Sequence, residues 1–319
     1  MRQGSGMTGD DVRARRLGRA YLALVGLTWA LIVFGAVVRA HGAGLACPDW
    51  PYCFGSLLPR MDFRVLLEWG HRVVAGTASL LFLAASWLAL RDPSTRAAVA
   101  RPLLLAGIVL PLQIVLGGLT VLHLLASWSV TFHLLLGNLF CLLLLLIARR
   151  LLDVFEPRRP STPWVRTLAL ITAAALLLQI ILGGLVSSNY AGLACPDWPT
   201  CRGSEWFPGF EGLIGLQIAH RVGGYFLALA YLALAISTLR EPLTGSLARI
   251  GLSLVLFQIL IGVANVLGRL PVEVTALHSA IGTLTVLVTT LLVRAILAGQ
   301  ARTRQASRTF SLSRGAECP

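Results

Sequence analysis

Long apolar segments alternate with short polar ones along almost the whole chain. A helix needs about 20 apolar residues to cross a bilayer core of about 30 Å. Eight segments approach or exceed that length, at residues 20–38, 66–90, 102–122, 127–148, 164–187, 212–238, 248–267 and 273–298. The first follows basic residues, as a signal peptide does, but its length and its place in the repeat described below favour a retained helix. The pattern predicts an all-α integral membrane protein.

Composition agrees with this pattern. Of the 319 residues 56% are hydrophobic and 13% are charged, whereas a soluble domain has roughly 25% charged residues. These values exclude an ordinary soluble domain and a disordered chain. All 27 basic residues are arginines, in a chain of net charge +13.

The arginines predict the orientation of the chain. A basic excess can indicate binding to nucleic acid, but these arginines lie between apolar segments, so we expect a membrane lipid partner and no nucleic acid. With a cytoplasmic N-terminus, the cytoplasmic segments hold 20 arginines and the outer segments hold 5. This split predicts that both termini are cytoplasmic.

The chain contains an internal repeat. Residues 44–53 read GLACPDWPYC and residues 192–201 read GLACPDWPTC, with nine of ten positions identical at an offset of 148. Matches at nearly the same offset include His71-Arg72 with His220-Arg221, His133 with His278, and 113–117 with 258–262. The repeat therefore spans four helices. Because each repeat has an even number of spans, both halves have the same orientation, related by a pseudo-twofold axis along the membrane normal.

The repeat divides the chain into two predicted four-helix bundles and their connections. We expect a cytoplasmic N-terminal tail (1–19), an N-terminal bundle (20–148), a cytoplasmic linker (149–163), a C-terminal bundle (164–298) and a cytoplasmic tail (299–319).

Four of the six histidines lie near the starts of the even-numbered predicted helices: His71, His133, His220 and His278. All even helices run inward, so the four rings should lie at one level in the outer leaflet, two in each bundle. Polar groups inside a membrane are costly and usually functional. Each histidine is followed four residues later, on the same helix face, by a small residue: Ala75, Gly137, Gly224 and Gly282. We expect these small residues to leave room for a flat ligand.

Paired histidines favour a haem site. A lone intramembrane histidine is most often a hydrogen-bonded core residue, but two imidazoles facing each other across a bundle suit a six-coordinate haem iron. Zinc would need a third or fourth ligand, and these helices offer none at that level. We therefore pair His71 with His133 and His220 with His278. The other two histidines, His41 and His123, lack a counterpart in the repeat and are expected at exposed helix ends.

One carboxylate breaks the symmetry of the halves. Glu68 precedes His71 by three residues, whereas Gln217, which cannot take up a proton, holds the equivalent place before His220. A carboxylate in a low-dielectric site is suited to proton transfer. The alternatives are that Glu68 orients the His71 ring or pairs with Arg72. Arg72 and Arg221 could bind haem propionates, or could extend to the membrane interface.

The outer loops carry equivalent cysteine pairs. Four cysteines allow three connectivities, and proximity and the repeat favour Cys47 with Cys53 and Cys195 with Cys201. An oxidising outer compartment permits both disulfides, and they serve either to shape a loop over the site or as a redox-active pair. Cys141 and Cys318 have no counterparts and look incidental.

Taken together, the eight spans in two halves, the GLACPDWPxC loops, the Glu68-x-x-His71-Arg72 motif and the four histidines resemble the haem A synthase family of the CtaA type. The resemblance covers about residues 20–298. It implies an oxidoreductase whose substrate is haem O, with the C8 methyl group oxidised through a hydroxymethyl stage to a formyl group. It also implies a location in the inner cell membrane.

The resemblance assigns roles to the two halves. His71, His133 and Glu68 match the family's substrate haem site, and His220 and His278 match its permanent haem b site. The cysteine pair of the first loop is the one linked to activity. Expected partners are haem O synthase, an electron partner and, in a homo-oligomer, a second copy of the chain.

Two other functions fit part of the pattern. A non-catalytic di-haem b-type cytochrome that transfers electrons explains the histidines but not the difference between Glu68 and Gln217. A transporter built from parallel repeats needs a polar cavity near the middle of the membrane, whereas the titratable residues here lie at the outer level.

Overall fold

The computed structural model of the chain describes residues 9–152 and 161–315, with side chains as far as residue 298. The first eight residues, the middle of the predicted linker and Cys318 lie outside the described residues. The described part consists of helices α1 (Gly9–Ala40), α2 (Phe63–Arg91), α3 (Pro93–Leu122), α4 (Ser127–Leu152), α5 (Pro163–Ser188), η1 (Ala191–Leu193), α6 (Gly212–Ser237), α7 (Pro242–Leu267) and α8 (Val272–Gly315).

All eight α-helices are long and apolar enough to cross a membrane. The prediction of an all-α membrane protein with eight spans is confirmed. Several helices extend beyond their predicted spans, and the longest extensions are at the start of α1, the start of α3 and the end of α8. α1 begins at Gly9 with Asp10 and Asp11 in its first turn, where negative charge interacts favourably with the helix dipole. α8 continues to Gly315, so part of the expected C-terminal tail is helical.

Helix starts follow ordinary capping chemistry. The Asp62 carboxylate accepts hydrogen bonds from the N–H groups of Arg64 and Val65 at the start of α2. Asp92 ends α2 and caps α3, and Thr162 caps α5 immediately before Pro163. Such caps satisfy N–H groups that have no partner within the helix, so these residues set where each helix begins.

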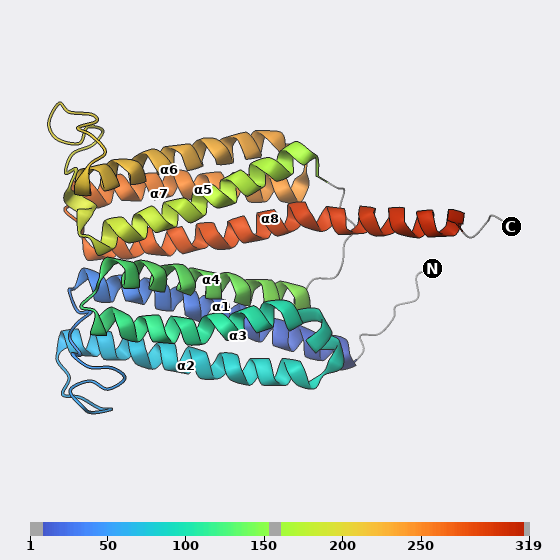
Figure 1. Ribbon diagram of the computed structural model, residues 1–319, viewed down its shortest axis with the longest axis horizontal. Coiled ribbons are helices and arrows are strands. Elements are labelled where there is room, and N and C mark those ends of the chain that lie inside the picture. The colour runs from blue at the N-terminus through green and yellow to red at the C-terminus, as the bar shows by residue number, and fades with distance from the viewer. Residues whose placement is uncertain (1–8, 153–160, 316–319) are drawn as a thin grey trace.

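The helices form two groups of four, with α1–α4 on one side and α5–α8 on the other (Figure 1). In the first group a core of buried residues surrounds Tyr21, Phe82 and Phe140, and in the second a core surrounds Tyr231 and Leu234. The groups meet through α1, α4, α5 and α8. The pseudo-twofold relation and the domain limits stay predictions.

Hydrogen bonds join the two groups. The indole N–H of Trp29 in α1 donates to the carbonyl of Ala280 in α8 at 3.0 Å. The hydroxyls of Thr131 in α4 and Ser188 in α5 lie 3.3 Å apart. At the end of α1, Arg39 donates to Ser187.

Equivalent turns in the two halves have matching backbones. Leu124 and Leu125, between α3 and α4, have φ values of 49° and 60°, and Arg269 and Leu270, between α7 and α8, have 61° and 64°. These turns support the loops that carry the repeated sequence. A Cβ atom at Gly44 would lie 3.4 Å from Leu125, and one at Gly192 would lie 3.1 Å from Leu270. The repeat found in the sequence thus extends to the packing of the loops.

Candidate functional site

Each of the four repeated histidines lies against a glycine of the preceding helix. A Cβ atom added at Gly35 would lie 3.2 Å from Cε1 of His71, and one at Gly117 would lie 3.1 Å from Cε1 of His133. In the second half the distances are 3.1 Å from Gly183 to His220 and 3.4 Å from Gly262 to His278. These distances are tight for a carbon contact. A larger residue at each glycine would therefore push the ring toward the centre of its bundle.

In the C-terminal bundle the rings of His220 and His278 lie close together. The ring centroids of His220 and His278 lie 6.5 Å apart, with an angle of 63° between the planes. A metal–imidazole bond is about 2 Å long, so two imidazoles on opposite sides of one metal ion have centroids roughly 6 Å apart. The residues of the C-terminal bundle thus fit a six-coordinate haem iron. In the N-terminal bundle His71 meets Phe34 edge-on, and its pairing with His133 stays a prediction.

Glutamines fill the spaces beside three of the histidines, where we had expected room for a flat ligand. Each glutamine packs its amide nitrogen against the glycine that follows the histidine. A Cβ atom added at that glycine would lie 3.1 Å from Gln113 at Gly137, 3.5 Å from Gln179 at Gly224 and 3.4 Å from Gln258 at Gly282. Sequence reasoning missed this role. The signal was available, because each glutamine stands four residues before the glycine that seats its histidine, in QIVLG, QIILG and QILIG.

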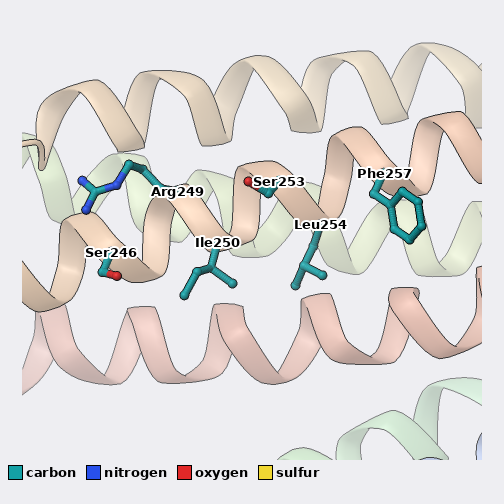
Figure 2. A pocket seen from close by; sticks show the side chains of 6 residues that line it. All are labelled: Ser246, Arg249, Ile250, Ser253, Leu254 and Phe257. Carbon is teal, nitrogen blue, oxygen red and sulfur yellow. The ribbon is translucent and has the colours of Figure 1, made fainter.

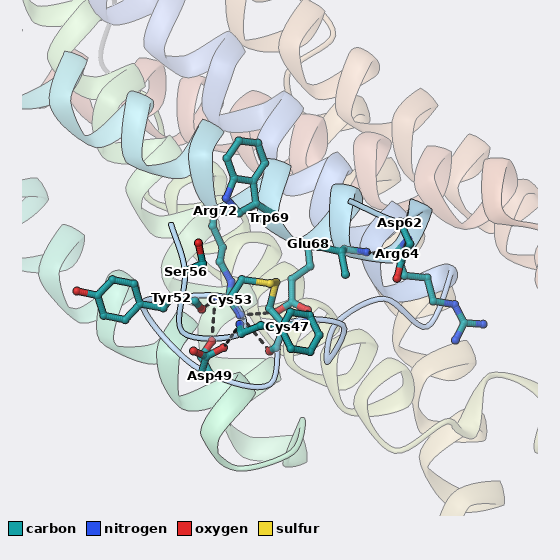
Figure 3. The surroundings of a disulfide bond; sticks show 12 residues. Cys47, Asp49, Tyr52, Cys53, Ser56, Asp62, Arg64, Glu68, Trp69 and Arg72 are labelled. Atoms are coloured by element: carbon teal, nitrogen blue, oxygen red, sulfur yellow. Dashed lines mark hydrogen bonds and ion pairs between the residues drawn. A yellow bond between two sulfur atoms is a disulfide. The ribbon is translucent and has the colours of Figure 1, made fainter. Parts of the chain in front are cut away.

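Glu68 lies beneath the first outer loop (Figure 3). Its side chain is buried, and one carboxylate oxygen accepts a hydrogen bond from the N–H of Cys47 at 2.8 Å. The other oxygen pairs with Arg72 at 2.5 Å. In the second half Gln217 donates to the carbonyl of Gly192 at 3.3 Å. The two residues occupy the same place, but only Glu68 forms an ion pair.

Both arginines that follow the repeated histidines bind the loop backbone. Arg72 donates to the carbonyls of Asp49 and Tyr52 at 2.8 and 2.7 Å. Arg221 donates to the carbonyls of Cys195, Asp197 and Thr200 at 2.8, 2.9 and 3.1 Å, respectively. The structure therefore gives each guanidinium a role in shaping a loop, and pairing with haem propionates stays a prediction.

The cysteines of each loop form a disulfide, Cys47 with Cys53 and Cys195 with Cys201. All four are buried. The first loop reaches back over the helices, because a Cβ atom at Gly118 in α3 would lie 2.9 Å from the indole of Trp50. The loop therefore covers the bundle beside the seat of His133.

Asp49 fixes the tip of the first loop. Its carboxylate accepts hydrogen bonds from the N–H groups of Gly55 and Phe54, both at 2.7 Å. The hydrogen bond from Gly55 is the largest of the effects that lower the pKa of Asp49 below its ordinary value, with further contributions from Phe54 and the charge of Arg72.

The remaining candidates lie away from the paired rings. His41 meets Phe63 edge-on, and exposed His123 meets Trp128 in the same way, both at helix ends. Cys141 is buried with a free thiol. Among the described residues no three His, Cys, Asp or Glu side chains gather into a metal site.

A separate cavity of about 430 Å³ follows one side of α7 (Figure 2). Its lining residues are Ser246, Arg249, Ile250, Ser253, Leu254 and Phe257. This lining contains neither a histidine nor a carboxylate, so the cavity is no part of the histidine site.

Comparison with known proteins identifies the family of the chain. A sequence profile of the COX15-CtaA family, described as cytochrome oxidase assembly protein, matches residues 19–65 and 60–291. A protein named Heme A synthase from Shewanella oneidensis is 33% identical over 298 residues, covering 79% of this chain and 88% of that protein. A protein of the same name from Symbiobacterium thermophilum is 30% identical, covering 70% of this chain and 74% of that protein. Another from Bacillus licheniformis is 24% identical, covering 78% of this chain and 85% of that protein. The chain therefore belongs to the COX15-CtaA family, whose members include proteins named haem A synthase.

Proposed function

We propose that this protein is a haem A synthase, an oxidoreductase that converts the C8 methyl group of haem O to a formyl group through a hydroxymethyl stage. Membership of the family supports haem A biosynthesis. The observation that carries the finer proposal is the buried carboxylate of Glu68, which is present beside one histidine pair and replaced by an amide beside the other.

The two histidine pairs receive different haems in this proposal. His71 and His133 bind haem O as substrate in the N-terminal bundle. His220 and His278 hold a resident haem b, which supplies one-electron transfer when it is bound. The ring separation of 6.5 Å in the second pair supports this assignment.

Glu68 accepts one of the two protons that each oxidation stage releases. Oxidation of methyl to hydroxymethyl adds the oxygen of water and releases an electron pair and two protons, and oxidation to formyl releases the same again. Glu68 lies one helical turn before His71, held by Arg72 and by the N–H of Cys47. From this place its carboxylate orients the water that attacks the activated methyl group and accepts a proton from it. The electrons leave the protein to the external electron partner.

The experiment replaces Glu68 with Gln and analyses the haems extracted from the purified protein and its membranes. We expect haem A to fall by about 10²-fold or more, as for loss of a general base, with haem O accumulating and haem B unchanged. Gln217→Ala is the matched control, and it should leave the ratio of haem A to haem O unaltered. Undiminished haem A in Glu68→Gln would remove Glu68 from the chemistry. Haem B as the sole pigment of the wild-type protein would instead indicate the di-haem cytochrome.

We place the protein in the inner cell membrane, with both termini in the cytoplasm. The distribution of arginines supports this orientation. Both disulfide loops lie at the end of the helices opposite the start of α1 and the extension of α8 (Figure 1), as an oxidising outer compartment requires. Haem O synthase, which would deliver the substrate, and a second copy of the chain complete the proposed partners.

A further inference from the structure

Three of the four histidines are tied to the neighbouring helix by a glutamine. The amide of Gln179 donates to the main-chain carbonyl of His220 at 2.9 Å and lies 3.1 Å from its Nδ1. The amide of Gln258 donates to the carbonyl of His278 at 2.8 Å.

The third glutamine has the same place in the N-terminal bundle. The amide nitrogen of Gln113 lies 3.4 Å from Nε2 of the His133 ring. A glycine four residues after each of these three histidines lets the carboxamide approach the helix that carries the ring.

The fourth histidine lacks this arrangement. Leu31 stands four residues before Gly35, where the other three helices have glutamine, and Ala75 replaces the glycine four residues after the histidine. The ring of His71 meets Phe34 instead, at 5.7 Å between centroids. Its Nδ1 atom is buried without a hydrogen-bond partner among the described residues, as are those of His133 and His278, so the missing glutamine and not the free Nδ1 sets His71 apart.

The glutamines retain unused hydrogen-bonding capacity that suits a metal-bound ring. The Oε1 atoms of Gln113, Gln179 and Gln258 are buried without a partner in the described part of the chain. An imidazole that binds a metal through Nε2 carries a hydrogen on Nδ1, which needs an acceptor. Partners of this kind orient the ring and raise its basicity, and their loss typically lowers metal affinity about 10–100-fold.

We infer that Gln113, Gln179 and Gln258 are positioning residues that hold three of the four haem ligands, and that His71 is the ligand built to release. This inference rests on the proposed function and deepens it. A substrate haem must enter and leave the N-terminal bundle, whereas the haem of the C-terminal bundle stays. In the N-terminal bundle, His133 is held firmly and His71 can leave the iron, which allows the substrate haem to exchange. In the C-terminal bundle both ligands are held firmly, which retains the haem.

The test measures ligand release with carbon monoxide as the probe, on the full-length purified protein with ferrous haem. Carbon monoxide binds a six-coordinate haem only when one histidine leaves the iron. The Gln258→Leu variant gives the His278 site a leucine at the position that Leu31 holds in the His71 site. We expect the fraction of C-terminal haem that binds carbon monoxide to rise about 10-fold or more, or the haem to be lost while both disulfides remain. Phe257→Leu, at the exposed neighbouring position, is the matched control and should behave as the wild type.

The converse variant combines Leu31→Gln with Ala75→Gly and installs the missing glutamine. We expect transfer of haem from the N-terminal bundle to an acceptor such as apomyoglobin to slow by about 10-fold or more. Leu31→Met with the native Ala75 is the control for side-chain volume.

Unchanged carbon monoxide binding in Gln258→Leu, with the haem retained, would overturn the inference, whatever the converse variant does. That outcome is distinct from failure of the proposed function, because haem A production by the wild type and by Gln258→Leu would still be observed. Absence of haem from the wild-type protein would overturn both.

Discussion

Individual glycines decide where large side chains fit in this molecule. A Cβ atom at Gly251 in α7 would lie 2.1 Å from the ring of Tyr231, which is fully buried and bonded to Thr289 through its hydroxyl. The ring therefore cannot move aside without losing that hydrogen bond.

We predict that Gly251→Ala destabilises the protein by about 1–3 kcal/mol, as overpacking of a core does. The free energy of unfolding in detergent would measure the effect. Gly107→Ala is the control, because its Cβ atom meets nothing within 4 Å, and it should be neutral or slightly stabilising. Equal stability of the two variants would contradict the packing described for Tyr231.

The carboxylate of Asp49 makes the first loop sensitive to acid. Its pKa in the folded protein lies below the ordinary value of about 3.9. The contribution of the carboxylate to the folded loop is therefore complete above that value and is lost as the pH falls through the lowered pKa. We predict that acidification below about pH 4 opens the loop and exposes the buried Cys47–Cys53 disulfide.

The rate at which a phosphine reduces Cys47–Cys53, relative to Cys195–Cys201 in the same molecule, measures this opening. The second loop is the internal control, because Asp197 accepts one loop N–H, from Gly203. Asp49→Asn should raise the relative rate at neutral pH and abolish its dependence on acid. A ratio that stays constant from neutral to acidic pH in the wild type would disprove the role of Asp49.

At the scale of residues, sequence analysis identified the candidate ligands but not the contacts that hold them. The histidines were identified because they recur at equivalent positions of the two halves, and such spacing can be read directly from the sequence. The glutamines beside three of the rings were missed because each contact joins two helices, and no periodicity within one helix reveals it. The loop-binding role of Arg72 and Arg221 was also hidden, since their partners are main-chain carbonyls, which every residue has.

At the scale of helices, the two halves differ in how equivalent helices begin. Asp62 caps α2 with its side chain, whereas Glu211 precedes α6 without a side-chain cap. We predict that Asp62→Ala lowers the free energy of unfolding by about 1 kcal/mol, the usual effect of losing a cap, and that Glu211→Ala has little effect. Thermal unfolding of both variants would measure the difference. Asp62→Asn should restore most of the loss, and failure of that rescue would argue against capping.

The sequence predicted the presence of all eight helices, because about 20 consecutive apolar residues are a strong signal of a span. The ends of α1 and α8 were not predictable in this way. Their extensions leave the apolar segment and include arginines such as Arg13 and Arg302, so hydropathy no longer distinguishes helix from tail there.

At the scale of the whole molecule, the two groups of helices are joined by few polar contacts. Lipid chains are as apolar as the helix surfaces, so packing and interhelical hydrogen bonds drive association in a membrane. For the same reason the sequence could not show that α1, α4, α5 and α8 form the contact between the groups.

We predict that Trp29→Phe lowers the free energy of unfolding by about 1 kcal/mol, the usual value of one intramolecular hydrogen bond. The lost bond is the one from the indole N–H to Ala280 across the two groups. Trp164→Phe is the control, because this tryptophan is 63% exposed. Equal melting temperatures for both variants in detergent would show that the bond contributes nothing to holding the groups together.

Each histidine rests on a glycine from its own group of four helices, so neither group borrows a ring or its seat from the other. The start of α1 and the extension of α8 also lie at the same end of the molecule (Figure 1). A circularly permuted gene that starts at α5, with α8 fused to α1, would therefore need no added membrane crossing and would rebuild both ring pairs from unchanged neighbours. We therefore expect the permuted chain to fold into the same architecture.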